Sequence, residues 1–183
     1  MIKMALTIIF DTNIYLDFLL IEDKKDSKES IPKYLKQSND IYDLIPKRKF
    51  KVIHSIWNEF ELRDQISKLN LERKFIMHGF SVPEFGKAKE IIVLNENDKN
   101  AIDDAALSLL EISKHEEVEL NMNEILKMVR KGLSFMDSIL VFQAEYNKNC
   151  DYLVTRDNTL RKQVNEFKFS EKVIGGKTFL SKI

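Results

Sequence analysis

The chain has 183 residues, which is long enough for one domain that buries its own core without disulfides or metal staples. Its 29 basic and 29 acidic residues cancel, so net charge gives no overall attraction to a polyanion, and any nucleic-acid surface has to be local. The single cysteine, Cys150, cannot pair within the chain, and we find neither an apolar run of about 20 residues nor a signal peptide. We therefore expect a soluble cytoplasmic protein without a membrane span.

Short apolar, β-rich runs alternate along the chain with longer segments of helical spacing. The runs predict strands at residues 6–10, 51–53, 91–94, 152–155 and 172–174. Apolar residues with helical spacing lie between them, notably around 56–66, 101–110 and 133–146. Such alternation is typical of βαβ units. The expected fold is of the α/β class, a three-layer α/β/α sandwich with a central, mostly parallel five-strand sheet.

Two stretches exceed what a minimal five-strand unit needs. Residues 22–49 mix both charges densely and contain two of the three prolines, so we expect a mobile charged insertion with a short helix around 34–44. Residues 95–131 are expected to add two helices, with a break near 116–121. Because no linker divides the chain, residues 1–183 are predicted to form a single domain.

Acidic residues follow the predicted strands at informative points. In an open parallel sheet, ligands bind in the crevice at the carboxyl ends of the strands. Asp11 follows the first strand directly, and Asp157 follows "YLVTR" in the same way. Glu59 and Asp137 lie near the starts of predicted helices, which begin at that same edge. We therefore expect these four carboxylates to converge.

A cluster of carboxylates needs compensation. Two of them about 4 Å apart repel by roughly 4 kcal/mol at an effective dielectric constant of about 20, so protons or cations have to enter. Oxygen ligands suit Mg²⁺ or Mn²⁺, whereas the histidines that zinc prefers, at positions 54, 78 and 115, are scattered without ligand spacing. Such hard ions activate water and neutralise the charge that develops on a phosphodiester. The pattern favours phosphodiester hydrolysis.

Four segments make the pattern more specific. "FDTNIYLD", "IWNEF", "FMDSILVFQA" and "LVTRDNTL" occur in this order between residues 10 and 160. Together they resemble the four acidic motifs of the PIN-domain nucleases. The resemblance implies a PIN-like sandwich and Mg²⁺- or Mn²⁺-dependent cleavage of RNA. Many small members of that family are toxins of VapC-type toxin–antitoxin pairs, which implies a cognate antitoxin and a homodimer as candidate partners besides RNA.

The resemblance also assigns roles to individual residues. The acids that it implies as metal ligands and catalytic groups are Asp11, Glu59, Asp137 and Asp157. The polar residues that it implies as support for the site are Thr12, Asn13 and Thr155. Basic residues next to the fourth motif are candidates for contacts to substrate phosphates, namely Arg156, Arg161 and Lys162.

The second acid is ambiguous, because "NEFEL" offers both Glu59 and Glu61. Two residues apart on a helix correspond to about 200° of rotation, so only one of them can face the crevice. We prefer Glu59, since Ile56 and Phe60 then remain available for the core. The register with Glu61 stays open.

Other classes of function compete with this interpretation. Each acid taken alone could be a helix cap or a solvated side chain. A HAD-type phosphotransferase requires a second aspartate where this chain has Asn13, so that class is disfavoured. A catalytically inactive PIN-like module that binds RNA or protein remains the alternative. The target RNA, the number of metal ions and the role of residues 22–49 are not readable from the sequence.

Overall fold

A single parallel sheet organises the molecule. The computed structural model describes residues 5–80 and 92–183, and within them five strands pair in the order β3-β2-β1-β4-β5. The strands are β1 (Leu6–Phe10), β2 (Phe50–His54), β3 (Lys114–His115), β4 (Tyr152–Val154) and β5 (Val173–Ile174). Every pairing is parallel, with β1 at the centre of the sheet. A parallel sheet of this kind has to be covered on both faces.

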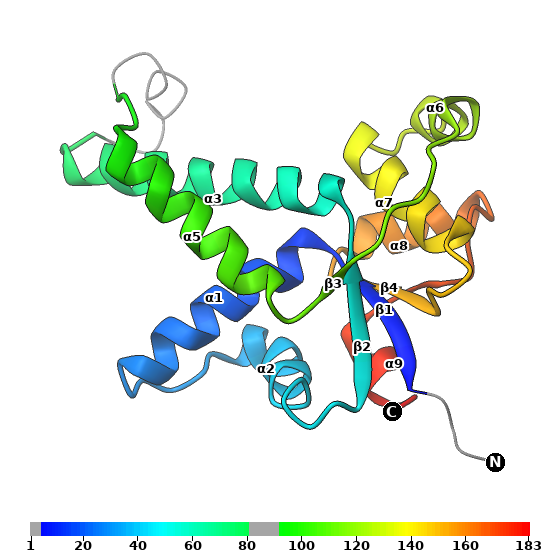
Figure 1. Cartoon of the computed structure of the whole chain (residues 1–183), viewed down its shortest axis with the longest axis horizontal. Coiled ribbons are helices and arrows are strands. Elements are labelled where there is room, and N and C mark those ends of the chain that lie inside the picture. Colours follow the sequence, from blue (N-terminus) through cyan, green and yellow to red (C-terminus); the bar gives the residue numbers. More distant parts are fainter. Residues whose placement is uncertain (1–4, 81–91) are drawn as a thin grey trace.

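Helices provide that cover, and they separate into two groups. The first group comprises α1 (Thr12–Asp26), α2 (Lys36–Tyr42) after a 3₁₀ turn at Lys33–Leu35, α3 (Ile56–Met77), α5 (Glu96–Leu110) and α9 (Gly176–Leu180). The second comprises α6 (Met122–Arg130), α7 (Phe135–Tyr146) and α8 (Asn158–Glu166). In Figure 1 the α3–α5 pair and the α6–α8 group extend to opposite sides of the strands. The predicted α/β/α sandwich is confirmed.

The side chains of β1 alternate between two cores. Ile8 and Phe10 are buried among the helices of the first group, whereas Ile9 is buried among those of the second. This is the period of two expected of a strand, here apolar on both faces because both are covered. The pattern explains why β1 reads as a continuous apolar run in the sequence.

One predicted strand is wrong. Residues 92–94 form no strand, and residue 91 lies outside the described residues. Ile92 is buried against Leu71 and Phe75 of α3, while Val93 is 83% exposed, so this segment packs on a helix end instead of entering the sheet. The third strand is Lys114–His115, just before the break predicted near residues 116–121.

The two additional stretches take the predicted helical form. A short helix occupies part of residues 22–49, although α1 first continues as far as Asp26. The mobility of this insertion stays a prediction. Helices α5 and α6 lie within residues 95–131 and are separated as expected. No helix of the described residues combines the length and apolar character needed to cross a membrane.

Candidate active site

The carboxyl edge of the sheet gathers the starts of three helices. Helix α1 begins two residues after β1, α3 two residues after β2, and α8 follows β4 after a short turn. Figure 1 shows α3 leaving the end of β2 near the start of α7. This edge therefore collects the polar residues that follow each strand, as expected for a binding crevice in a parallel α/β sheet.

Asp11 lies at the centre of this edge and is only 5% exposed. Its backbone N–H donates to the carbonyl oxygen of Val154 at 3.0 Å, which joins it to β4. Its Oδ2 atom accepts hydrogen bonds from Asn13 Nδ2 at 2.7 Å and from the Thr155 hydroxyl. Although Asp11 occupies the N-cap position of α1, its side chain makes no capping bond. The carboxylate is thus held by polar neighbours and does not cap the helix.

Burial makes the charge on Asp11 costly. The pKa of Asp11 is raised from 3.8 to about 6, mainly by burial, while the hydrogen bonds from Thr155 and Asn13 lower it and the charge of Asp137 adds to the rise. A carboxyl group that desolvation and a like charge hold back from ionising is typical of functional sites.

Glu61 is the acid of α3 that reaches this group. Its Oε2 atom accepts a hydrogen bond from the hydroxyl of Thr12 at 2.6 Å. Burial raises the pKa of Glu61 from 4.5 to about 7, with further contributions from the charges of Asp11 and Asp137. Because Thr12 directly follows Asp11 in the chain, this hydrogen bond links Glu61 to the segment that carries Asp11.

Glu59, the acid that we prefer from the sequence, lies elsewhere. Its Oε1 atom is 3.4 Å from His54 Nε2 and 3.6 Å from His115 Nδ1. The reason is the rotation of α3. Ile56 and Phe60 are 51% and 62% exposed, and the helix instead buries a stripe that includes Asn58, Leu62 and Ile66. The structure therefore corrects the expected placement of Glu59 and favours the alternative register with Glu61.

Asp137 and Asp157 complete the acidic group, and both lie at the starts of helices. Asp137 Oδ2 accepts from the Ser134 hydroxyl at 2.6 Å, and its own N–H donates to that hydroxyl at 3.0 Å. Burial raises the pKa of Asp137, and the charge of Asp157 adds to the rise. Asp157 Oδ1 caps α8, and its N–H donates to the Thr155 hydroxyl at 2.9 Å. Asp157 is thus both the cap of α8 and a member of the acidic group.

The predicted basic contacts take different positions. Arg156 Nη1 lies 2.7 Å from Oδ1 of the fully buried Asp17, as an ion pair without the angles of a hydrogen bond. Arg161 donates a hydrogen bond to the side-chain oxygen of Asn158, and Lys162 is exposed. Arg156 thus has a structural partner, and the contact of all three with phosphates stays a prediction.

The donor set of the acidic group fits a hard divalent cation. Asp11, Glu61 and Asp137 offer carboxylate oxygens whose pKa values are raised first by burial and then by the charges of neighbouring acids. The side-chain oxygen of Asn13, next to Asp11, is buried and accepts no hydrogen bond from the described residues. All-oxygen donors with excess negative charge suit Mg²⁺ or Mn²⁺.

The acids are not drawn tightly together. Within the described part of the chain, one group of three histidine, cysteine or acidic residues has its potential ligand atoms within 4.8 Å of one another. That group is His54, Glu59 and His115, and it includes no member of the acidic group. The histidine trio corrects our expectation that the histidines have no partner at ligand distance.

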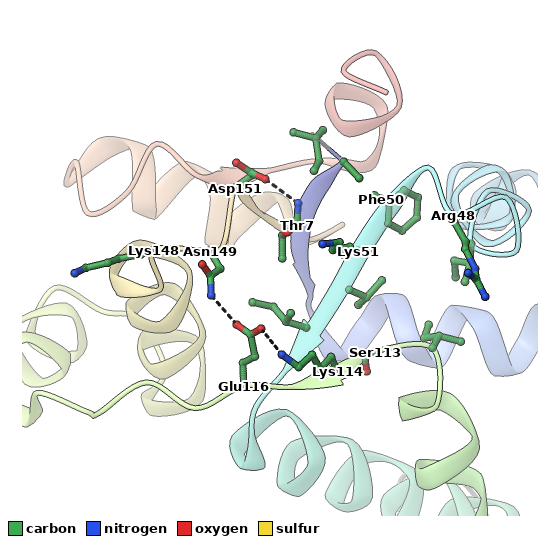
Figure 2. A pocket seen from close by; sticks show the side chains of 16 residues that line it. Thr7, Arg48, Phe50, Lys51, Ser113, Lys114, Glu116, Lys148, Asn149 and Asp151 are labelled. Carbon is green, nitrogen blue, oxygen red and sulfur yellow. Dashed lines mark hydrogen bonds and ion pairs between the residues drawn. The ribbon is translucent and has the colours of Figure 1, made fainter. Parts of the chain in front are cut away.

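A cavity of about 910 Å³ lies apart from the acidic group (Figure 2). Its lining comes from the early parts of β1 and β2, β3, and the turn before β4, and includes Arg48, Lys51 and Lys148. Glu116 accepts hydrogen bonds across it from Lys114 and Asn149, both at 3.3 Å. None of the four acids lines this hollow. The candidate site is therefore identified by its acidic residues and by the raised pKa values of three of them, and not by the volume of a cavity.

Comparisons with known proteins support the fold alone. No protein-family model matches the chain, and no curated protein matches it significantly. Among solved structures, the chain is similar to PAE2754 from Pyrobaculum aerophilum, with 16% sequence identity and a TM-score of 0.53 over 98% of this chain and 96% of that one. The likeness extends over essentially the whole chain and agrees with a single α/β/α sandwich.

The acidic group predicts a particular dependence of stability on pH. Because folding raises the pKa of Asp11 from 3.8 to about 6, its contribution is most favourable below about pH 4 and is lost as pH rises through 6. The loss in the free energy of unfolding amounts to about 3 kcal/mol when Asp11 is fully ionised. For a chain of this size, each kcal/mol changes Tm by roughly 2–4 °C. With a chelator present, the difference in Tm between Asp11→Asn and wild type should therefore be larger, in favour of the variant, at pH 7.5 than at pH 4.5. Thermal unfolding at both pH values checks this, and an equal difference at the two values would contradict it.

Proposed function

We propose that this protein is a metal-dependent nuclease that hydrolyses RNA phosphodiester bonds within the strand. The observation that carries the proposal is the buried Asp11, whose pKa is raised to about 6 and whose ionisation is coupled to that of Asp137. Glu61 shares the environment, with a pKa of about 7. Several buried or half-buried acids whose ionisations are coupled, at the ligand-binding edge of a parallel sheet, favour cation binding over a purely structural role.

The residues of such a site have two roles, to bind the cation and to orient its ligands. Asp11, Glu61 and Asp137 would hold Mg²⁺ or Mn²⁺, with Asp157 adding negative charge near Asp137. A bound ion of this kind supplies a lowered pKa for the attacking water and compensation for charge on the phosphate oxygens. Thr155 and Asn13 orient Asp11 through its Oδ2 atom. Thr12 fixes Glu61 through Oε2, so that both carboxylates keep one geometry.

The choice of RNA as substrate, and the partners, rest on the motif resemblance. The PIN-like pattern favours single-stranded or looped RNA in the cytoplasm, and a toxin role would require an antitoxin that covers the acidic crevice. A homodimer belongs to the same proposal. Arg161 and Lys162, on the helix that Asp157 caps, are the basic residues proposed to meet a phosphate near the acids.

Cleavage of a mixed, structured RNA by the purified protein tests the function. We expect cleavage in Mg²⁺ and Mn²⁺, abolition by EDTA, and recovery on adding Mn²⁺ back, because only the loaded site can activate water. Products are resolved on a denaturing gel against intact RNA. Folded protein, free of a bound inhibitor, that cleaves nothing in either metal would contradict the nuclease. Retained RNA binding in that case would indicate the inactive module.

A further inference from the structure

A second group of potential metal ligands lies at the β3 side of the sheet. His54 ends β2 and His115 ends β3, and the two are register partners on neighbouring parallel strands. Their rings meet edge to face, with centroids 5.2 Å apart. Glu59, in the first turn of α3, lies over both, with its Oε1 atom 3.4 Å from His54 Nε2 and 3.6 Å from His115 Nδ1. Residues from three separate elements thus present three donor atoms to one point.

The hydrogen bonds of Ser113 favour a His54 tautomer whose inner nitrogen, Nε2, is free to act as a ligand. The Ser113 hydroxyl donates its one hydrogen to the carbonyl oxygen of Leu110 at 2.8 Å. The same hydroxyl oxygen lies 2.7 Å from His54 Nδ1, so it accepts a hydrogen bond from Nδ1–H. A neutral His54 protonated on Nδ1 carries a lone pair on Nε2, the atom that faces Glu59. A lone pair that faces a carboxylate oxygen without a hydrogen between them favours a cation in the gap.

His115 has the equivalent support on its other side. Its Nε2 atom lies 3.0 Å from Oε1 of Glu117, and that oxygen also accepts a hydrogen bond from the backbone N–H of Ile56 at 2.7 Å. A carboxylate that takes the outer N–H of a histidine directs the lone pair of the inner nitrogen, here Nδ1, toward the shared point. This pairing recurs around metal-bound histidines in proteins.

The spacing and the chemistry of the trio fit a transition metal. Tetrahedral coordination at the usual 2.0–2.1 Å places ligand atoms about 3.3 Å apart, close to the two distances from Glu59. Imidazole nitrogens favour Zn²⁺ and its neighbours over Mg²⁺. We propose that His54, Glu59 and His115 form a three-ligand site for a divalent transition metal ion, Zn²⁺ in the first place, separate from the acidic crevice.

Such a site would join three elements of the fold through one ion. It joins the two-residue edge strand β3 to the end of β2 and to the first turn of α3, the helix that also holds Glu61. His115 is 49% exposed, which leaves the fourth coordination position open to water. Occupation should therefore stabilise the β3 edge and the start of α3, and raise the Tm of the whole chain.

Titration of the full-length, metal-free protein with Co²⁺ and Zn²⁺ tests the site. We expect one Co²⁺ to bind with a visible absorption band typical of four-coordinate cobalt, and Zn²⁺ to displace it. In His115→Ala the band should disappear, and the affinity for Zn²⁺ should fall by more than the roughly 10- to 100-fold that loss of an outer-shell partner costs. Glu117→Gln alters an outer-shell partner of His115, so its loss of Zn²⁺ affinity should lie within that roughly 10- to 100-fold range.

Matched variants show whether Zn²⁺ binds at this trio or elsewhere on the chain. His78→Ala removes the remaining, exposed histidine and should leave Zn²⁺ affinity unchanged. Asp11→Asn should also leave it unchanged, because the acidic crevice uses different residues. The Tm of metal-free His115→Ala shows whether the variant is folded, and Glu59→Gln provides a second deletion of a ligand. Absence of the cobalt band in wild type, or equal Zn²⁺ affinity in wild type, His115→Ala and Glu59→Gln, would overturn the proposal.

Discussion

Replacement of Asp11 by Asn is expected to lower the rate of RNA cleavage by more than about 100-fold, beyond the range for loss of a residue that only supports a metal ligand. Asn keeps the shape of the side chain and an oxygen that can accept from Thr155 and Asn13, but it removes the charge that would hold the cation. Initial rates on one labelled RNA, in saturating Mn²⁺, measure the effect. The loss should persist at every Mn²⁺ concentration tested.

Two comparisons decide whether that loss is chemical. Asp104→Asn makes the same change at an exposed position of α5 and should cleave like wild type. The metal-free Asp11→Asn protein should be at least as stable as wild type at neutral pH, because the buried charge with the raised pKa is gone. An active Asp11→Asn protein would remove Asp11 from the mechanism. A variant that is both inactive and unfolded would contradict the expected stability.

The strands that could be predicted are those whose sequence pattern reflects burial on both faces. β1, β2 and β4 read as short apolar runs and appear within one or two residues of the predicted bounds. β3 could not be predicted, because its two residues, Lys114 and His115, are exposed and become a strand only by pairing with β2. The apolar run near residue 92 misled because Ile92 is buried by a helix, and apolar character does not specify the burying partner.

The acidic site was predictable to the same degree. Asp11, Thr155 and Asp157 are placed by the ends of strands, and these positions follow directly from strand prediction. The rotation of α3 was not predictable from its own pattern, because Ile56 and Phe60 are apolar and exposed while Asn58 is buried. The capping box of Ser55 and Asn58 is the usable signal, because it marks the start of the helix and ties Asn58 to the cap. Leu62, one turn beyond Asn58, then lies on the same buried face. The histidine trio depends on a strand register, which sequence spacing does not encode.

The register of α3 gives the second prediction with a large effect. Glu61→Gln should lower cleavage by more than about 100-fold, because it removes a carboxylate coupled to Asp11 and Asp137. Glu59→Gln should lower it by less than about tenfold when Zn²⁺ is withheld, because Glu59 faces the histidines. Initial rates of both variants, over a Mn²⁺ series, measure the contrast. The Mn²⁺ concentration for half-maximal rate should rise only for Glu61→Gln.

Glu72→Gln, an exposed change further along α3, supplies the matched control and should cleave like wild type. Because Gln at position 61 can still accept a hydrogen bond from Thr12, the loss measures the charge and not the contact. The reverse order, with Glu59→Gln inactive and Glu61→Gln active, would mean that the cation is held by the histidine side of α3. The nuclease would then use a transition metal between His54 and His115, and the carboxylates around Asp11 would lose their assigned role.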